Sequence, residues 1–237
     1  MSIKAVLFDL DGTLLPMDQD VFVKAYFSGL VKKLAVVGYE PEKLIKAIWF
    51  CSSEMVKNDG RRTNEEVFWD NISKIYGRDV RLDSPIFDEY YRDGFDEVKR
   101  VCSYNEKADK VVKWVKAHGL RAVLATNPLF PSIATEKRAG WAGLDLRDFE
   151  LYTTFENSRF SKPNVKYYED ILKTLGVKPE EALMVGNDVT EDMVVKNIGM
   201  SVFLLTDNLI NKENKDISEF PNGNFDDLMV FLNSILQ

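Results

Sequence analysis

The second half of the chain alternates between short apolar runs and stretches with helical periodicity, and this alternation limits the possible folds more than any other feature. Strands are predicted at residues 120–126, 150–155, 182–186 and 201–206. Helices are predicted at residues 107–117, 132–140, 164–175, 191–198 and 225–236. Strands that alternate with helices are typical of a parallel sheet with right-handed crossovers. With the apolar run at residues 3–8 as a further buried strand, the sequence predicts an α/β fold with a Rossmann-like, three-layer core, and residues 208–224 are expected to form a surface loop.

Residues 18–100 differ from the rest of the chain because they lack strand-like runs. Their apolar residues recur at spacings of three and four, which predicts four helices. Pro41 suits the start of the second helix, Thr63 with Glu66 forms a capping-box pattern for the third, and Asp83-Ser84-Pro85 is expected to cap the fourth. We therefore expect a four-helix domain at 18–100, inserted into a core made by 1–17 and 101–237.

Composition and charge exclude several classes of function. The net charge of −7 argues against a protein that binds nucleic acid through a basic surface. No apolar run reaches 18 residues, and Asp9 and Asp11 would interrupt a signal peptide, so neither a membrane helix nor a secretory leader is expected. Cys51 and Cys102 are interpreted as reduced core residues of a cytoplasmic protein. His118 is the single histidine, and it fits a helix C-terminus. With no other histidine, neither a His-based triad nor a multi-His metal site is expected.

Two carboxylates follow the first predicted strand. Asp9 and Asp11 stand two residues apart, and the turn at Gly12 can re-aim them. The carboxyl ends of parallel strands are where open α/β sheets bind ligands. Two acids there repel each other unless a cation lies between them, and Mg²⁺ prefers such oxygen ligands. Taken alone, an Asp-x-Asp-Gly sequence also fits a helix N-cap and a solvated turn.

The later strands also end in polar residues. Thr126 and Asn127 follow one strand and could hold phosphate oxygens through a hydroxyl and backbone amides. Lys162 precedes a predicted helix start, where an ammonium can hold an anion. An acidic cluster, with Asp188 and Asp192 four residues apart, follows the strand at 182–186. Each feature alone equally fits an ordinary turn, a solvated lysine or acids that complement a helix dipole.

Together, these four strand ends resemble the motifs of the haloacid dehalogenase (HAD) superfamily. The first motif is Asp9-Leu10-Asp11-Gly12-Thr13 and the second is Leu124-Ala125-Thr126-Asn127. The third is Lys162-Pro163, and the fourth runs from Val185 to Asp192. The resemblance covers the whole chain in the right order, and the helical insert resembles the family's cap of the first type (subfamily I).

The resemblance implies a role for each site residue. Asp9 would be the nucleophile that forms an aspartyl-phosphate, and Asp11 would be the general acid and base. Lys162 would offset the charge of the nucleophile and the phosphoryl group, opposite Mg²⁺, which would also take the backbone carbonyl of Asp11. Thr126 would hold non-bridging oxygens. The remaining phosphate contacts would come from Leu10 and Asn127, with Gly12, Thr13 and Asp192 in support.

The fourth motif departs from the family pattern, in which Gly-Asp is followed by a second acid four or five positions later. Here Gly186 is followed by Asn187 and then Asp188. Either Asn187 holds the metal position, five residues before Asp192, or Asp188 does, four residues before it. The interpretation adopted is a metal site with Asp9, Asp11, Asn187 and Asp188, in which Asp188 supplies the charge.

The expected activity is that of a Mg²⁺-dependent phosphatase that hydrolyses a small phosphorylated metabolite, as a monomer or weak homodimer, with cap residues setting the substrate. Asp11 separates this from a dehalogenase, which needs no acid for an alkoxide. The alternatives are a phosphomutase, a phosphonate hydrolase and a non-catalytic protein that binds phosphorylated ligands, prompted by Asn187. A phosphonate hydrolase would need a cap lysine for a Schiff base, and the candidates are Lys24, Lys32, Lys33, Lys46 and Lys57.

Overall fold

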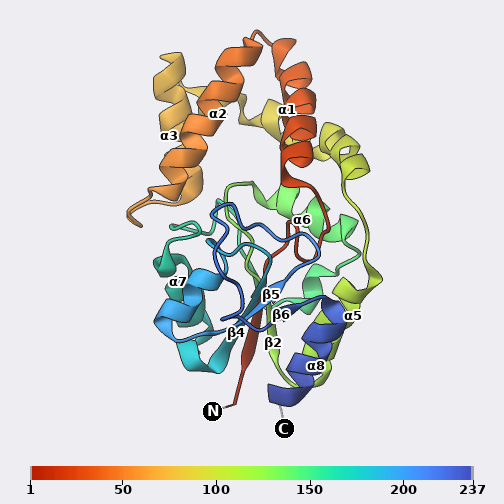
Figure 1. The fold of residues 1–237 in the computed structure, drawn as a ribbon. Coiled ribbons are helices and arrows are strands. Elements are labelled where there is room, and N and C mark those ends of the chain that lie inside the picture. Colours follow the sequence, from red (N-terminus) through yellow and green to blue (C-terminus); the bar gives the residue numbers. More distant parts are fainter. Residues whose placement is uncertain (1, 236–237) are drawn as a thin grey trace.

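The core of the computed structural model, which describes residues 2–235, is a parallel sheet of six strands in the order β3-β2-β1-β4-β5-β6 (Figure 1). Phe8, at the end of the central strand, is level with Leu124 of one neighbour and Val185 of the other. The carboxyl ends of these three strands therefore meet at one edge. The strands are β1 Ala5–Phe8, β2 Arg121–Leu124, β3 Leu151–Tyr152, β4 Ala182–Gly186, β5 Ser201–Leu205 and β6 Asn222–Gly223.

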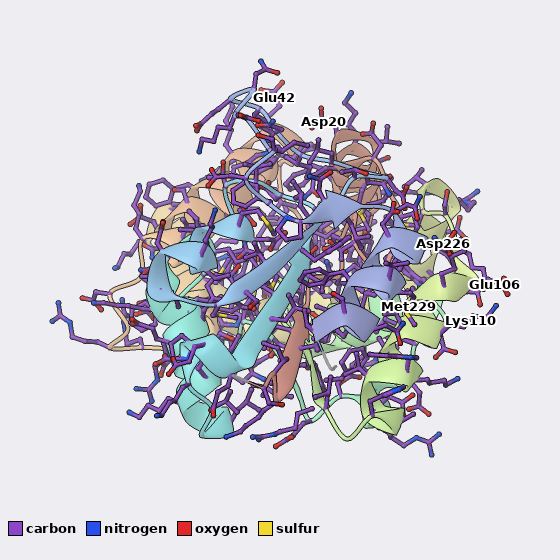
Figure 2. The ribbon with its side chains drawn as sticks, turned by 60° about the horizontal axis from the view of Figure 1, so that its bottom comes forward. Asp20, Glu42, Glu106, Lys110, Asp226 and Met229 are labelled. Carbon is purple, nitrogen blue, oxygen red and sulfur yellow. The ribbon has the colours of Figure 1, made fainter. Side chains whose placement is uncertain are left out.

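Helices cover both faces of the sheet, because β1 is apolar on both sides. Val6 and Phe8 join one apolar cluster with the helices α5 (Glu106–Ala117), α6 (Ser132–Trp141) and α8 (Phe225–Ile235). Ala5 and Leu7 join a second cluster with α7 (Val165–Leu175) and the 3₁₀-helix η6 (Met193–Ile198). Figure 2 shows α5 and α8 side by side at one side of the sheet. The parallel sheet and its three layers confirm the predicted fold class.

The helical insert lies beyond the carboxyl edge of the sheet (Figure 1). It contains α1 (Gln19–Ala35), α2 (Pro41–Val56) and α3 (Asn64–Tyr76), and the predicted capping box at Thr63 is present. The predicted fourth helix is instead four short pieces. These pieces are the 3₁₀-helix η1 Val80–Asp83, α4 Ser84–Glu89, the π-helix η2 Tyr90–Gly94 and the 3₁₀-helix η3 Phe95–Val101.

Side-chain packing explains why this fourth segment is irregular. Tyr90 and Tyr91 are consecutive, yet both are buried against Tyr26 of α1, with ring centroids 6.2 and 6.4 Å away. A regular α-helix turns about 100° per residue, so the wider π-turn helps both rings face inward. Asp83 does occupy the N-cap position of α4, with Pro85 in the first turn, as predicted. Its carboxylate makes no capping bond, however, and instead accepts hydrogen bonds from Tyr39 and Arg78.

The insert contacts the core at the chain crossings, near the start of α3, and where η3 meets α6. At the chain crossings, Met17 pairs with Cys102, and Ser103 N–H donates to the Pro16 carbonyl at 2.8 Å. At the far end, Asn64 at the start of α3 is fully buried, and its side chain donates to the carbonyl of Pro128 (3.2 Å) and the hydroxyl of Ser161 (3.0 Å). Asn64 thus ties the insert to both loops that carry the second and third motifs, a contact that the sequence did not reveal.

Several smaller predictions changed. β3 is shorter than the predicted strand at 150–155, and β6 lies inside the predicted loop 208–224. The predicted helix at 191–198 is a turn followed by η6, because carboxylates bind the backbone of residues 187–192. The predicted last helix is confirmed to Ile235, and its final residue lies outside the described residues.

The structure also tests the predictions made for single residues. His118 directly follows the last residue of α5, as expected. Cys51 is buried and Cys102 half-buried, and both are free. No helix within residues 2–235 is long and apolar enough to cross a membrane.

Candidate active site

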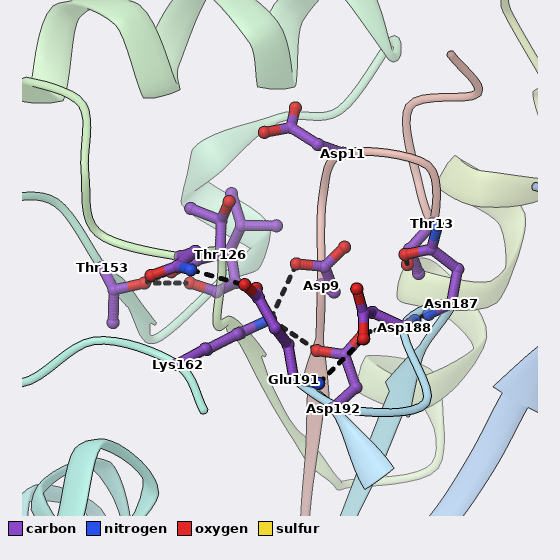
Figure 3. A network of polar contacts seen from close by, with 12 residues as sticks. Asp9, Asp11, Thr13, Thr126, Thr153, Lys162, Asn187, Asp188, Glu191 and Asp192 are labelled. Atoms are coloured by element: carbon purple, nitrogen blue, oxygen red, sulfur yellow. Dashed lines mark hydrogen bonds and ion pairs between the residues drawn. The ribbon is translucent and has the colours of Figure 1, made fainter. Parts of the chain in front are cut away.

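Asp9 lies at the centre of the carboxyl edge of the sheet (Figure 3). Its N–H donates to the Val185 carbonyl at 2.9 Å, which continues the pairing of β1 with β4 by one residue. The Asp9 side chain is only 9% exposed, and Oδ1 accepts a hydrogen bond from Lys162 Nζ at 2.7 Å. The sheet therefore fixes the backbone of Asp9, and one cation fixes its carboxylate.

Lys162 is buried, with 1% of its side chain exposed, so it is not a solvated surface lysine. Its Nζ lies 2.7 Å from Asp9 Oδ1 and 2.7 Å from Asp192 Oδ1. Burial alone would lower the pKa of Lys162, but Asp192 and Asp9 together raise it well above its ordinary value. The ammonium therefore stays charged at neutral pH.

Asp192 braces the loop that carries the fourth motif. Its Oδ2 accepts hydrogen bonds from the backbone N–H groups of Asn187 (3.1 Å) and Asp188 (3.0 Å), while Oδ1 pairs with Lys162. Gly186 leaves the necessary space, because a Cβ atom there would lie 2.2 Å from Asp192 Oδ2. The structure thus brings the third and fourth motifs into direct contact.

Asn187 and Asp188 have different surroundings. Asn187 is buried; its Oδ1 accepts from the Thr13 hydroxyl at 3.0 Å, and its Nδ2 donates to the Asn208 carbonyl at 2.6 Å. Gly12 (φ +83°) packs against the same side chain. Asp188 uses Oδ1 to accept from two backbone N–H groups, and Figure 3 shows its side chain beside Asp9. Asn187 therefore joins two loops, whereas Asp188 keeps Oδ2 without a hydrogen bond within residues 2–235.

Thr126 and Asn127 lie across the site from Asp188, after β2. Thr126 is buried, and its carbonyl accepts from the Thr153 hydroxyl (2.7 Å) and the Tyr167 hydroxyl (2.8 Å). These bonds use the carbonyl and leave the Thr126 hydroxyl free for another partner. Asn127 Oδ1 is buried without a partner among the described residues.

Glu191 is a site residue that the sequence analysis did not single out. Its Oε2 accepts a hydrogen bond from Asn127 Nδ2 at 3.0 Å, which links the second and fourth motifs. Burial raises the pKa of Glu191, while the charge of Lys162 opposes that rise. Its position next to Asp192 in the acidic cluster was the available signal.

Arg138 is the second residue that the sequence analysis missed. It lies on α6, has no exposed side-chain surface, and forms an ion pair with Asp11 Oδ2. Its guanidinium also lies over the Phe130 ring, 4.5 Å from the centroid. The sequence did contain a signal: Arg138 stands four residues after the buried Ala134, on the inner stripe of the helix.

Asp11 is turned away from Asp9 toward this arginine (Figure 3). Burial raises the pKa of Asp11, while Arg138 opposes the rise and Asp9 adds to it. Asp11 Oδ1 is buried and has no partner among residues 2–235. One oxygen of the Asp11 carboxylate is therefore held by a buried cation, and the other has no hydrogen bond within the described residues.

The donor set at this edge fits Mg²⁺. Asp9 and Asp188 each have one carboxylate oxygen engaged and one without a hydrogen bond within residues 2–235. No cluster of three or more His, Cys, Asp or Glu side chains poised for a metal occurs in that range. Mg²⁺ needs no such cluster, because it binds through one or two carboxylates and completes its shell with water and substrate phosphate.

Comparison with known proteins identifies the family of this chain. Residues 3–195 match the family model of haloacid dehalogenase-like hydrolases. The chain is 28% identical over 197 residues to a Clostridium perfringens protein named as a pyrophosphatase, covering 83% of this chain and 81% of that protein. It is also 35% identical over 72 residues to a glyceraldehyde 3-phosphate phosphatase from Methanothermobacter thermautotrophicus. That alignment covers 30% of this chain and only 32% of the enzyme.

Solved structures show the same fold at low sequence identity. A HAD phosphatase from Thermococcus onnurineus aligns with a TM-score of 0.59 and 20% identity, covering 97% of this chain and 98% of that one. A 2-haloacid dehalogenase from Pseudomonas syringae gives a TM-score of 0.59 at 18% identity, covering 98% of this chain and 99% of that one. The fold, the order of the motifs and the family match together establish that this chain belongs to the haloacid dehalogenase-like hydrolases.

Proposed function

We propose that this protein is a Mg²⁺-dependent phosphatase that acts through an aspartyl-phosphate on Asp9. The observation that carries the proposal is the buried ammonium of Lys162, 2.7 Å from Asp9 Oδ1. This ammonium offsets the negative charge of the Asp9 carboxylate in a site from which water is largely excluded. The named phosphatase among the relatives supports this class of reaction.

In the first step, an Asp9 carboxylate oxygen attacks phosphorus, and the bond from phosphorus to the ester oxygen breaks. The leaving alkoxide takes a proton from the carboxyl group of Asp11. Burial raises the pKa of Asp11, which favours the protonated form needed here. Thr126 and the Asn127 amide would hold the non-bridging oxygens, and Leu10 would contribute its backbone N–H.

In the second step, water attacks the phosphorus of the acyl phosphate. Asp11, now a carboxylate, takes a proton from that water, and the bond from phosphorus to the Asp9 oxygen breaks. Inorganic phosphate leaves, and both aspartates return to their starting states. Lys162 stabilises the negative charge that spreads over the phosphoryl oxygens in both steps.

Mg²⁺ would be held by Asp9 and Asp188, together with the backbone carbonyl of Asp11. When bound, Mg²⁺ would neutralise negative charge on the phosphoryl group. The partnered amide of Asn187 and the unengaged oxygen of Asp188 support a metal site at Asp188. In this proposal Asn187, Gly12 and Thr13 hold the loops together, and Asp192 positions Lys162.

The helical insert at 18–100 would act as the cap over a core of residues 1–17 and 101–237. The cavity between the two parts has no lysine among its lining residues. None of the five candidate lysines in the insert lines this cavity, so the cavity gives no support to the phosphonate-cleaving alternative.

The test is phosphate release from acetyl phosphate and from a panel of phosphate monoesters, with and without Mg²⁺. We expect Mg²⁺-dependent release, and we expect Asp9→Asn to lower it by at least about 10³-fold, as for loss of a nucleophile. Hydroxylamine should trap a phosphoryl-enzyme in the unmodified protein. Full activity of Asp9→Asn would refute the mechanism, and transfer of phosphate within the substrate without release would favour a phosphomutase.

A further inference from the structure

A cavity of about 150 Å³ lies between the helical insert and the core. Its walls come from α1, α2, α3, α4 and η2 of the insert, and from residues 129–131 and Phe155 of the core. It is partly open to solvent, because Gln19, Trp49 and Asp88 of its lining are exposed. An apolar cavity of this volume has room for a molecule such as benzene.

The lining of this cavity is aromatic and carries no cation. Its rings include Phe27, Trp49, Phe68, Trp69 and Phe87, and none of its lining residues is Lys, Arg or His. Sugar hydroxyls or a carboxylate placed here would lose water without gaining enough partners, which is costly.

The polar side chains of the lining offer little to a polar ligand. The hydroxyls of Tyr26 and Tyr91 bond each other at 2.8 Å, and the remaining polar side chains are Gln19, Ser52 and Asp88. Asp88 is exposed at the edge of the lining, and its carboxylate adds negative charge. An anionic group would therefore meet repulsion at this wall rather than a counter-ion.

The cavity adjoins the candidate active site through two residues. Phe130 forms part of its wall, and the guanidinium of Arg138, which pairs with Asp11, lies over the same ring. Gln19 lines both the cavity and a neighbouring hollow that includes Gly12 and Asn187. The cavity is therefore next to Asp11, the group from which the leaving alcohol would take its proton.

We infer that the substrate is a phosphate monoester whose alcohol part is uncharged and apolar, alkyl or aryl, with about the size of a phenyl ring. This inference rests on the proposed function and names its substrate class. The ester oxygen lies at Asp11, and the apolar group enters the cavity between the insert and the core.

An alkyl series tests the inference, because its members share one leaving-group chemistry. From ethyl to propyl to butyl phosphate, kcat/KM should rise about fourfold for each added methylene, the factor expected for burying one CH₂. Two matched pairs test polarity: ethyl phosphate against phosphoglycolate, and propyl phosphate against glycerol phosphate. The apolar member of each pair should be favoured at least tenfold. A flat series, or preference for the polar members, would overturn the inference.

A pair of variants tests whether the preference for apolar substrates arises in this cavity. Ser52→Arg places a cation at the cavity wall and should reduce the alkyl preference, while the ratio for phosphoglycolate over ethyl phosphate rises at least tenfold. Ser53→Arg, one residue on and outside the lining, should leave both ratios as they are. Equal effects of the two variants would count against the assignment.

Calorimetry separates this inference from the proposed function. Asp9→Asn should bind the alkyl phosphates with affinities that rise along the series even if no compound is hydrolysed. Hydrolysis of every ester and of acetyl phosphate without a chain-length trend would leave the phosphatase intact and overturn only the substrate class. A rising affinity without turnover would support the cavity and refute the phosphatase.

Discussion

Replacement of Arg138 by Met tests how strongly the buried ion pair with Asp11 supports the site. Arg138 has no exposed side-chain surface, and it donates to Asp11 Oδ2, to the Ala134 carbonyl (3.2 Å) and to the Thr135 hydroxyl (3.3 Å). Methionine retains much of the apolar stem but removes the charge and all these donors. The substitution therefore isolates the electrostatic role better than alanine would.

The expected loss of stability follows from burial. Removing one partner of a fully buried pair costs about 3–5 kcal/mol, because the other charge is left uncompensated. Asp11 retains 17% exposure and can take up a proton, which reduces the cost. We therefore expect the free energy of unfolding to fall by about 2–3 kcal/mol at pH 7. For a chain of this length, that corresponds to a fall in Tm of about 4–12 °C.

The loss should depend on pH. Burial already raises the pKa of Asp11 above 3.8, and Arg138 opposes that rise, so the pKa should be higher still in Arg138→Met. A carboxyl group with a raised pKa in the folded state favours folding at low pH, and this contribution disappears as pH rises through the folded pKa. The deficit of the variant should therefore be smaller at acidic pH than at alkaline pH.

Urea unfolding at several pH values measures this dependence, and the neighbouring Lys137→Met is the matched control. Lys137 pairs with Asp96 at the surface, where Asp96 is 56% exposed, so its loss should cost less than about 1 kcal/mol. A double-mutant cycle with Asp11→Asn gives the coupling directly. A deficit that is the same at all pH values, or a coupling below about 0.5 kcal/mol, would refute the reasoning.

Two further predictions concern the loops around the site. Asn64→Ala should lower the free energy of unfolding by about 1–3 kcal/mol, because its buried partners Ser161 and Asn58 lose their hydrogen bonds. Asn71→Ala on the same helix is the control and should cost less, because the Asn71 side chain donates to the Val67 carbonyl of its own helix. Equal melting temperatures of the two variants would contradict this prediction. Asp188→Asn should weaken activation by Mg²⁺ more than Asn187→Ala does, and a titration of activity against Mg²⁺ with the reverse order would place the metal at Asn187.

The sequence predicted the core of the fold well, because its strands are short apolar runs with polar residues at their ends. β4 was predicted with its observed bounds, and the central position of β1 follows from its being apolar on both faces. Predictions failed where side chains override backbone preference. The π-turn at Tyr90–Gly94 depends on rings that pack against α1, and β6 exists only because residues 222–223 reach the edge of β5. Neither contact produces a periodic pattern of residues in the sequence.

The residues of the candidate site that belong to a sequence motif could be predicted. Asp9, Lys162 and Asp192 are brought together by the sheet edge, as motif order implied. Arg138 and Asn64 belong to no such motif. They are polar residues on otherwise buried helix faces, and their roles depend on partners 127 and 97 positions away along the chain. Tertiary structure alone brings such partners together.

The balance of charge around Asp9 gives a last prediction. The carboxylates of Asp9, Asp188, Glu191 and Asp192 surround one ammonium, Lys162, while Arg138 is engaged by Asp11. A phosphate dianion would be repelled from such a site unless negative charge is removed first. Two routes exist: a divalent cation between Asp9 and Asp188, and a proton on Glu191, whose pKa burial raises.

The affinity for inorganic phosphate tests both routes. At pH 8 this affinity should rise when Mg²⁺ is added. In Glu191→Gln, which is neutral at every pH, binding at pH 8 should be tighter than in the unmodified protein, because one negative charge is removed from the site. Calorimetry of both proteins with and without Mg²⁺ at pH 8 measures these effects. An affinity that is indifferent to Mg²⁺ and to the loss of the Glu191 charge would mean that these carboxylates do not control access of phosphate to Asp9.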